Sequence, residues 1–264
     1  MIPSAVRDAL QPANGVPPLW STTIMKSTLA PKWRAAAGLV CMVLASASAY
    51  CAPKAVKASY GGFINGLAVG IITEHFEVND SAYRIVSDTK PTGLAVLAQR
   101  QPPKFSSTGQ LTREGLKPSH FEARRTGADQ PQVAADFDWA RGTLVLKHDG
   151  KVESLPVLAG TQDRLSIMYQ FMFMPFEKAR YIDFAMTNGR KLDRYRYHVT
   201  PDVEIDTPLG RLKTLHLVKQ RDADDSAAEL WLSPQHHHLP VRMLFIERNG
   251  MRLEQIIQSL EFRE

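Results

Sequence analysis

The chain has 264 residues, of which 44% are hydrophobic and 22% are charged, with a formal net charge of +5. Residues 1–49 carry four basic side chains and one acidic one, so they hold most of this surplus. The rest of the chain keeps a net charge of about +2, too little for the electropositive surface with which proteins neutralise nucleic-acid phosphates. The composition therefore excludes a nucleic-acid partner, while the length suffices for a single domain with its own core.

The N-terminal region is typical of an export signal. Three basic residues precede an apolar run over residues 35–45, which is too short to span a bilayer as a stable helix. Ala47-Ser48-Ala49 then matches the small-x-small pattern that signal peptidase cuts. We predict that residues 25–49 are a signal peptide cleaved after Ala49. Residues 50–264 then form one periplasmic domain without a transmembrane segment.

Residues 1–24 have no place upstream of a signal peptide. Two explanations stay open: a start codon assigned too early, with Met25 as the initiator, or a short-lived disordered extension. Cysteine usage agrees with export, because Cys41 leaves with the signal and Cys51 alone cannot form an internal disulfide. Lipidation of Cys51 is disfavoured, since a lipobox requires a small residue directly before the cysteine and this chain has Tyr50.

After residue 58 the chain is punctuated by residue pairs that favour tight turns. The runs between them are rich in β-branched and aromatic residues and alternate in polarity, as half-buried strands do. We predict a mainly β fold, an antiparallel meander of about ten to twelve strands that forms a curved sheet or barrel-like domain. Most of the pairs supply the positive φ angles of two-residue hairpins; they are Asn65-Gly66, Asn79-Asp80, Glu114-Gly115, Asp149-Gly150, Asn188-Gly189 and Asn249-Gly250.

Two segments depart from this pattern of strands and tight turns. Residues 92–99 are predicted to form a short helical turn over an open end of the sheet. Residues 161–174 predict a helix, with Thr161 as its N-cap and Asp163 in the first turn, where the helix dipole favours an anion. Pro175 is expected to end this helix.

The predicted helix is apolar nearly all the way round, with Ser166 and Gln170 as a narrow polar strip. Such a helix is either enclosed by protein or faces something apolar. It therefore either plugs the core of the sheet or forms a wall or gate of a lipid-sized cavity. Three methionines, Met168, Met172 and Met174, fit both interpretations, because flexible thioethers fill gaps and also suit adaptable binding surfaces.

The start of this helix gives the candidate ligand site. Asp163 and Arg164 either cap the helix and form a local ion pair, or contact a ligand headgroup at a cavity mouth. The candidate ligand-binding residues, taken with the apolar positions that follow, are Asp163, Arg164, Leu165, Met168, Tyr169 and Met172.

Three consecutive histidines, His236–His238, raise the question of a metal site. On a strand His236 and His238 share a face while His237 points away, and zinc would need further ligands from elsewhere. Pro234 and Pro240 flank the triplet and favour a tight exposed connection. We predict an exposed polar turn, and assign the chain no metal and no cofactor.

Other catalytic patterns are weak. The sequence lacks a Gly-x-Ser-x-Gly elbow, a His-Glu-x-x-His motif and a phosphate-binding glycine loop. Asp136 and Asp138 imitate the carboxylate pair of a glycosidase, but alternation places both on one polar face of a strand. The acidic run at residues 221–229 lacks the spacing of an EF-hand and predicts a solvated hairpin tip. No catalytic residue is assigned.

Four blocks of the sequence, in order, resemble a family of exported bacterial proteins known as domain of unknown function 3108. The resemblance implies a periplasmic, β-rich, barrel-like or half-barrel fold and supplies no catalytic residues. In that family the three histidines occupy what looks like a variable spacer. The blocks are "KPTGLAVLAQR" (residues 90–100), "GTQDRLSIMYQF" (160–171), "TPLGRLKTLHL" (207–217) and "ELWLSPQHHHLPVRM" (229–243).

These observations favour a non-enzymatic periplasmic protein that binds an apolar or amphipathic ligand, such as a lipid, or supports envelope maintenance. One alternative is a hydrolase of envelope glycan or lipid that uses Asp136, Asp138 or the histidines. Another is a scaffold that recruits a partner protein through a sheet edge.

Overall fold

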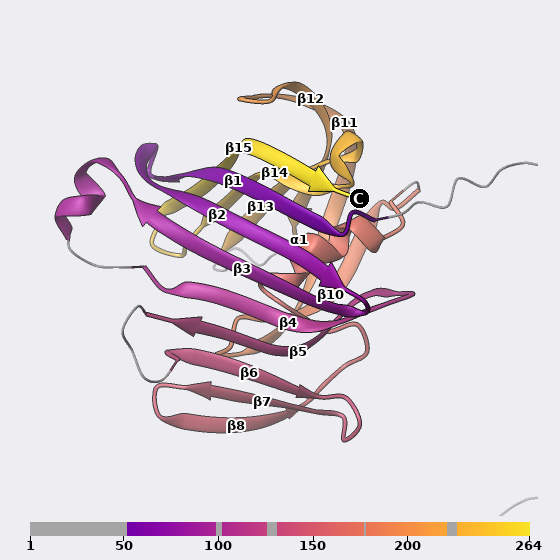
Figure 1. Ribbon diagram of the computed structural model, residues 1–264. Helices are drawn as coiled ribbons and strands as arrows, with labels where there is room; N and C mark the ends of the chain where they lie inside the picture. Colours follow the sequence, from indigo (N-terminus) through magenta and orange to yellow (C-terminus); the bar gives the residue numbers. More distant parts are fainter. Residues whose placement is uncertain (1–51, 99–101, 126–130, 177, 221–225) are drawn as a thin grey trace, which may run out of the picture. The chain divides into compact units, whose positions relative to one another are not determined.

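A computed structural model describes most of the chain after its N-terminal region (Figure 1). All described residues belong to one compact unit, Ala49–Glu264. The predicted signal peptide, the extension before it and Cys51 lie outside the described residues, as does most of the acidic run before β13. The described residues are 52–98, 102–125, 131–176, 178–220 and 226–264.

The described residues form one sheet of fifteen strands, which confirms the predicted antiparallel meander but exceeds the predicted number of strands. Some of the extra strands have little apolar alternation, because they lie at an edge of the sheet; β8, for example, is almost wholly exposed. The strands are β1 Ala55–Ile64, β2 Leu67–Asn79, β3 Ala82–Pro91, β4 Lys104–Thr112, β5 Gly115–Arg124, β6 Val133–Asp138, β7 Thr143–His148, β8 Lys151–Pro156, β9 Gln162–Asp163, β10 Tyr181–Thr187, β11 Leu192–Thr207, β12 Gly210–Lys219, β13 Ala227–Ser233, β14 Leu239–Ile246 and β15 Arg252–Arg263.

Nearly every strand lies beside its neighbours in sequence. The order across the sheet is β8-β7-β6-β5-β4-β3-β2-β1-β15-β14-β13-β12-β11-β10-β9. The pairing of β1 with β15 joins the two ends of the meander antiparallel, so the first and last strands lie side by side in the middle of the sheet (Figure 1). Among the described strands, only the two-residue β9 pairs in parallel, with β10.

The sheet curls so that β9, the strand at one edge, faces β5, which lies eleven places away in the strand order. The amide nitrogen Nε2 of Gln162 in β9 donates a hydrogen bond to the carbonyl of Leu116 in β5, at 2.8 Å. Because β8 and β9 form the two edges and do not pair in the described sheet, the structure is barrel-like but open. The predicted curved sheet is thereby confirmed.

The predicted hairpin turns are present. Asn65 and Gly66 both have positive φ angles, of 49° and 80°, and Asp149 and Gly150 have 51° and 75°, which are the backbone angles of two-residue hairpins. Asp80 supplies the positive φ angle between β2 and β3. The sequence therefore identified the places where the strands reverse.

The helical segments are short: η1 Gly93–Ala98, α1 Ser166–Gln170, η2 Phe171–Phe173 and η3 Pro234–His236. The turn η1 confirms the prediction for residues 92–99. No helix among the described residues is long and apolar enough to cross a membrane.

The main helix begins later than predicted. It runs through α1 and η2, from Ser166 to Phe173, and its N-cap is Leu165, so the expectation of Thr161 as N-cap was wrong. The reason is that the residues before it pair with β10 as strand β9. The C-terminal end is as predicted, because Met174 is extended directly before Pro175, as a residue before proline prefers.

The helix lies inside the curl of the sheet, which explains why it is apolar on all sides. Its buried side chains divide between two hydrophobic clusters. Ile167 and Phe171 pack with strands β10–β15, together with parts of β1 and β2. Leu165, Tyr169 and Met172 pack mainly with strands β1–β7. Protein therefore packs against the helix from two sides, in agreement with one of the two alternatives that the sequence left open.

Candidate functional site

A cavity of about 800 Å³ lies between the start of the main helix and strands β10–β15. Ligand pockets for small molecules commonly measure about 300–1,000 Å³. Its lining is mixed, with apolar side chains beside charged ones, as an amphipathic ligand requires. The large apolar and aromatic lining residues are Met168, Met186, Tyr195, Tyr197, Phe245, Ile246, Met251 and Leu253, and the charged ones are Arg164, Lys191, Lys219, Glu247 and Arg248.

The predicted ligand residues divide between the cavity and the core. Arg164 and Met168 line the cavity. The other four are buried, with Asp163 fully enclosed, and do not line the cavity; they are Asp163, Leu165, Tyr169 and Met172.

Asp163 fixes the backbone where β9 turns into the helix. Its Oδ1 accepts hydrogen bonds from the backbone N–H groups of Leu165 and Ser166, at 2.8 and 2.9 Å. Its Oδ2 accepts one from the Ser107 hydroxyl at 2.6 Å, and Ser107 contacts the Tyr83 hydroxyl in turn. Burial raises the pKa of Asp163, against the lowering effect of these hydrogen bonds. The carboxyl precedes the helix rather than lying in its first turn, which corrects the predicted position.

Glu74 is a second buried carboxyl, on β2. Its Oε2 accepts a hydrogen bond from the Tyr169 hydroxyl at 3.1 Å. Burial raises its pKa, while hydrogen bonds from Tyr169 and Ser87 and the charge of Arg164 act in the opposite direction. Two buried acids therefore lie near the same guanidinium, an arrangement that is more frequent at functional sites than elsewhere.

Arg164 faces the cavity with its guanidinium held from one side. The guanidinium carbon lies 4.5 Å from the centre of the Phe105 ring, a cation–π contact. The Arg164 side chain is exposed at the cavity, and the attraction of Glu74 and Asp163 favours its charged form. Across the described residues, none accepts a hydrogen bond from the guanidinium, and the predicted ion pair with Asp163 does not form.

The other cavity cations have partners of their own. Lys191 forms an ion pair with Asp193, with 2.6 Å between nitrogen and oxygen. Lys219 donates to the carbonyl of Ser226 at 3.1 Å and lies over the Tyr195 ring. Their charges are thus partly compensated at the cavity wall, unlike the hydrogen-bond donors of Arg164.

One sequence signal for this site lies on β2, outside the residues predicted to bind a ligand. Ile72, Glu74 and Phe76 alternate along β2, and all three are buried. A carboxylate at an inward position of an alternating strand needs a buried partner. Ser107 and Phe105 carried no comparable signal, because only the folded sheet brings them to the helix.

The three histidines form the predicted turn but are half-buried rather than exposed. His237 and His238 adopt the left-handed conformation, with φ angles of 55° and 58°. His236 and His237 pack against Phe262, whereas His238 packs against Phe176. The rings thus take aromatic partners, and no group of three His, Cys, Asp or Glu side chains suited to a metal ion occurs among the described residues.

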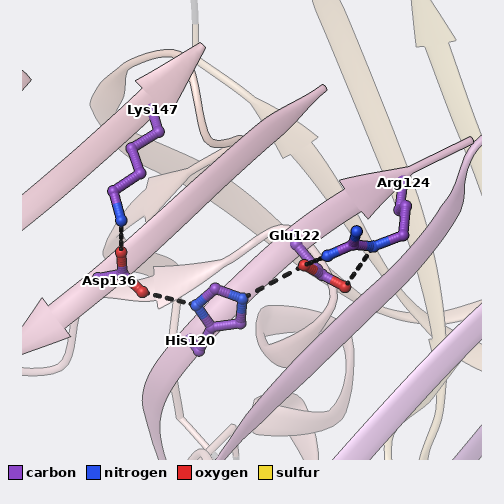
Figure 2. A network of polar contacts seen from close by, with 5 residues as sticks. All are labelled: His120, Glu122, Arg124, Asp136 and Lys147. Carbon is purple, nitrogen blue, oxygen red and sulfur yellow. Dashed lines mark hydrogen bonds and ion pairs between the residues drawn. The ribbon is translucent and has the colours of Figure 1, made fainter. Parts of the chain in front are cut away.

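Of the carboxylate pair on β6, Asp136 lies in a polar network on the face of the sheet opposite the core (Figure 2). Asp136 contacts His120 Nδ1 at 2.6 Å and Lys147 Nζ at 2.8 Å. His120 Nε2 lies 3.6 Å from Glu122, which forms an ion pair with Arg124. These side chains are 22–54% exposed.

Asp138, the other member of the pair, is used in the turn after β6. It accepts a hydrogen bond from the backbone N–H of Arg141 at 2.9 Å and pairs with the Arg141 side chain. The two carboxylates therefore serve separate local contacts.

Comparison with known proteins agrees with the resemblance noted in the sequence. The profile of a family described as "Protein of unknown function (DUF3108)" matches residues 56–255, which confirms that prediction. No curated protein matches the chain.

Among solved structures, a β-barrel-like protein of domain of unknown function DUF1849 from Brucella abortus has a TM-score of 0.48 at 11% identity, covering 81% of this chain and all of the other. A candidate lipoprotein from Parabacteroides distasonis has 0.33 at 12% identity, covering 80% and 96%. A candidate outer membrane lipoprotein-sorting protein domain from Vibrio parahaemolyticus has 0.25 at 10% identity, covering 79% and 85%. Likenesses at this level carry no argument about function.

Proposed function

The chain belongs to the DUF3108 family, and we propose that it holds an apolar or amphipathic ligand in the cavity between the helix and strands β10–β15. The observation that carries the proposal is the cavity itself. It has the volume of a small-molecule site, and methionine and aromatic side chains supply much of its lining.

The position of the helix supports this proposal. One side of it is packed into the core, so the helix is a fixed wall, while Met168 on the other side is half-buried and lines the hollow. Burial of an acyl chain in such a space removes its surface from water at about 25 cal/mol per Å². The driving force needs no catalytic group.

We also propose that the mature protein works in the periplasm. The support is the signal-like sequence at residues 25–49. Mass spectrometry of the exported protein should find Tyr50 as its first residue, and a protein that retains residues 25–49 in the cytoplasm would contradict the location.

Native mass spectrometry of protein purified from periplasm tests the ligand proposal. We expect a co-purified amphiphile, and uptake of an uncharged fluorescent probe such as Nile red by protein stripped of it. Ala228 lines the cavity from β13, so Ala228→Phe should fill part of the space and reduce uptake severalfold.

The matched control is Val152→Phe, on the exposed edge strand β8 and distant in the strand order from the cavity, which should leave uptake unchanged. Repeated ligand-free spectra together with no uptake of the probe would contradict the proposed function.

A further inference from the structure

The chemistry of the ligand headgroup follows from Arg164. A guanidinium has five N–H donors in a planar fork and no acceptor, and it stays charged in proteins. In this chain the guanidinium faces a cavity of about 800 Å³, and no described residue accepts a hydrogen bond from it. Arg164 is exposed at the cavity, so its N–H donors are accessible to an acceptor that arrives with the ligand.

The two buried carboxyls do not fill this role, because both are occupied elsewhere. Asp163 uses both of its oxygens to accept from Ser107 and from two backbone N–H groups. Glu74 accepts from the Tyr169 hydroxyl. Neither forms an ion pair with Arg164 in the described structure, although their charges attract it.

The same surroundings allow an anion to approach. Neither Glu74 nor Asp163 lines the cavity, and its charged lining residues are four cations and one acid, Glu247. The Phe105 ring covers one face of the guanidinium and restricts its rotamers, so the fork is held in place before a ligand binds.

We infer that Arg164 binds the anionic headgroup of the ligand, a carboxylate or a phosphate, while the apolar part lies against Met168 and the strands of the cavity. Both headgroups match the bidentate geometry of a guanidinium. This inference rests on the proposed function and adds the class of ligand: a single-chain amphiphile with an acidic headgroup.

Displacement of Nile red by three probes with the same alkyl chain tests the inference: laurate, dodecyl phosphate and 1-dodecanol. On the wild-type protein at neutral pH, we expect at least one of the anions to compete about ten to a hundred times better than the alcohol, the range given by a charge-assisted hydrogen bond. The more effective of the two identifies the preferred headgroup, and either preference supports the inference.

Variants at this position separate the headgroup contact from packing. Arg164→Met should abolish the preference for the anions and leave displacement by 1-dodecanol unchanged. Arg164→Lys should keep part of the preference, because it retains the charge without the fork. The control Arg190→Met removes an exposed arginine that pairs with Asp149 and does not line the cavity, and it should behave as the wild type.

The outcomes are distinguishable. Equal competition by the anions and the alcohol on the wild-type protein would overturn the inference and leave the proposed function standing. If a folded Arg164→Met protein lost Nile red displacement equally for all three probes, this would also overturn the inference, since the Arg164 side chain would then act only by supporting the cavity. Absence of any binding to the wild-type protein would overturn the proposed function itself.

Discussion

The two sides of the main helix differ in how they meet the sheet. Toward strands β1–β7 the contact is solid: Leu165 and Tyr169 are almost fully buried, and the Tyr169 ring stacks on Phe76 with 4.9 Å between ring centres. Toward strands β10–β15 the helix packs through Ile167 and Phe171, while Met168, and Arg164 just before the helix, border the cavity. An apolar helix can therefore be enclosed by protein and still have one hollow side.

The two sides of the helix therefore have different roles. The packed side fixes the helix to the sheet, and Gln170 adds to this by accepting a hydrogen bond from the Leu116 backbone N–H and donating one to the Glu114 carbonyl. The hollow side can then change its contents without unfolding the domain. Substitutions on the two sides, and on the outer face of the sheet, measure how far this separation holds.

The largest expected effect comes from removing a side chain on the packed side. Leu165→Ala should lower the free energy of unfolding by about 2–5 kcal/mol, because it leaves a void in a close-packed core. Met168→Ala, three residues later, should cost less, about 1 kcal/mol, because this side chain packs against both clusters but is only partly buried and borders the cavity. Urea denaturation of both variants makes the comparison, and equal losses would contradict the difference between the sides.

Asp163 should have the next largest effect. Asp163→Ala leaves the backbone N–H groups of Leu165 and Ser166 and the hydroxyl of Ser107 without their acceptor, which should cost about 1–3 kcal/mol. Asp163→Asn keeps a carbonyl oxygen for the backbone and should recover most of this loss. Thermal unfolding of the two variants tests the assignment, and an Asn variant as unstable as the Ala variant would count against it.

Glu74 should make stability depend on pH. Its folded pKa lies above the ordinary value because it is buried, so its contribution to stability is complete below the unfolded pKa and is lost as the pH rises through the folded pKa. Glu74→Gln removes this titration and keeps an acceptor for Tyr169. The variant should therefore gain stability relative to the wild type as the pH rises from acidic to neutral, by no more than about 1 kcal/mol.

Melting temperatures of Glu74→Gln and the wild type across this pH range make the measurement. A difference that stays constant with pH, or that grows as the pH falls, would contradict the assignment.

The smallest effect is expected on the opposite face of the sheet. Lys147→Ala removes an exposed partner of Asp136 and should cost about 0.5 kcal/mol, less at high salt. Although burial raises the pKa of Asp136, hydrogen bonds from Lys147 and His120 hold it below the ordinary value. The contribution of Asp136 to the free energy of unfolding is thus present at neutral pH and lost as the pH falls. The pH dependence of Glu74 has the opposite sign. Unfolding at two salt concentrations checks the size of the effect, and a loss of several kcal/mol would contradict it.

The sequence predicted those features that depend on neighbouring residues. Asn65-Gly66 and Asp149-Gly150 adopt positive φ angles by themselves, so the hairpins were readable. The all-round apolar pattern correctly indicated that the helix is enclosed. The start of the helix was placed too early, because the pairing of Gln162 and Asp163 with β10 is a contact between distant segments that competes with helix formation.

The candidate site could be predicted only in part from the sequence, because it also depends on contacts between distant segments. Glu74 meets Tyr169 across 95 positions of the chain, and Ser107 meets Asp163 across 56. Periodicity along one segment carries no information about such pairs. It also cannot show which side of an enclosed helix is packed and which is hollow, because Leu165 and Met168 read alike in the sequence.

The most direct test of the cavity is a crystal structure of the wild-type protein soaked with 12-bromododecanoic acid. We predict an anomalous bromine peak in the hollow bordered by Met168, Met186 and Phe245, with the carboxylate at Arg164. A fully occupied bromine peak on the outer surface with no density in the hollow, or a hollow filled by the protein's own side chains, would contradict this prediction.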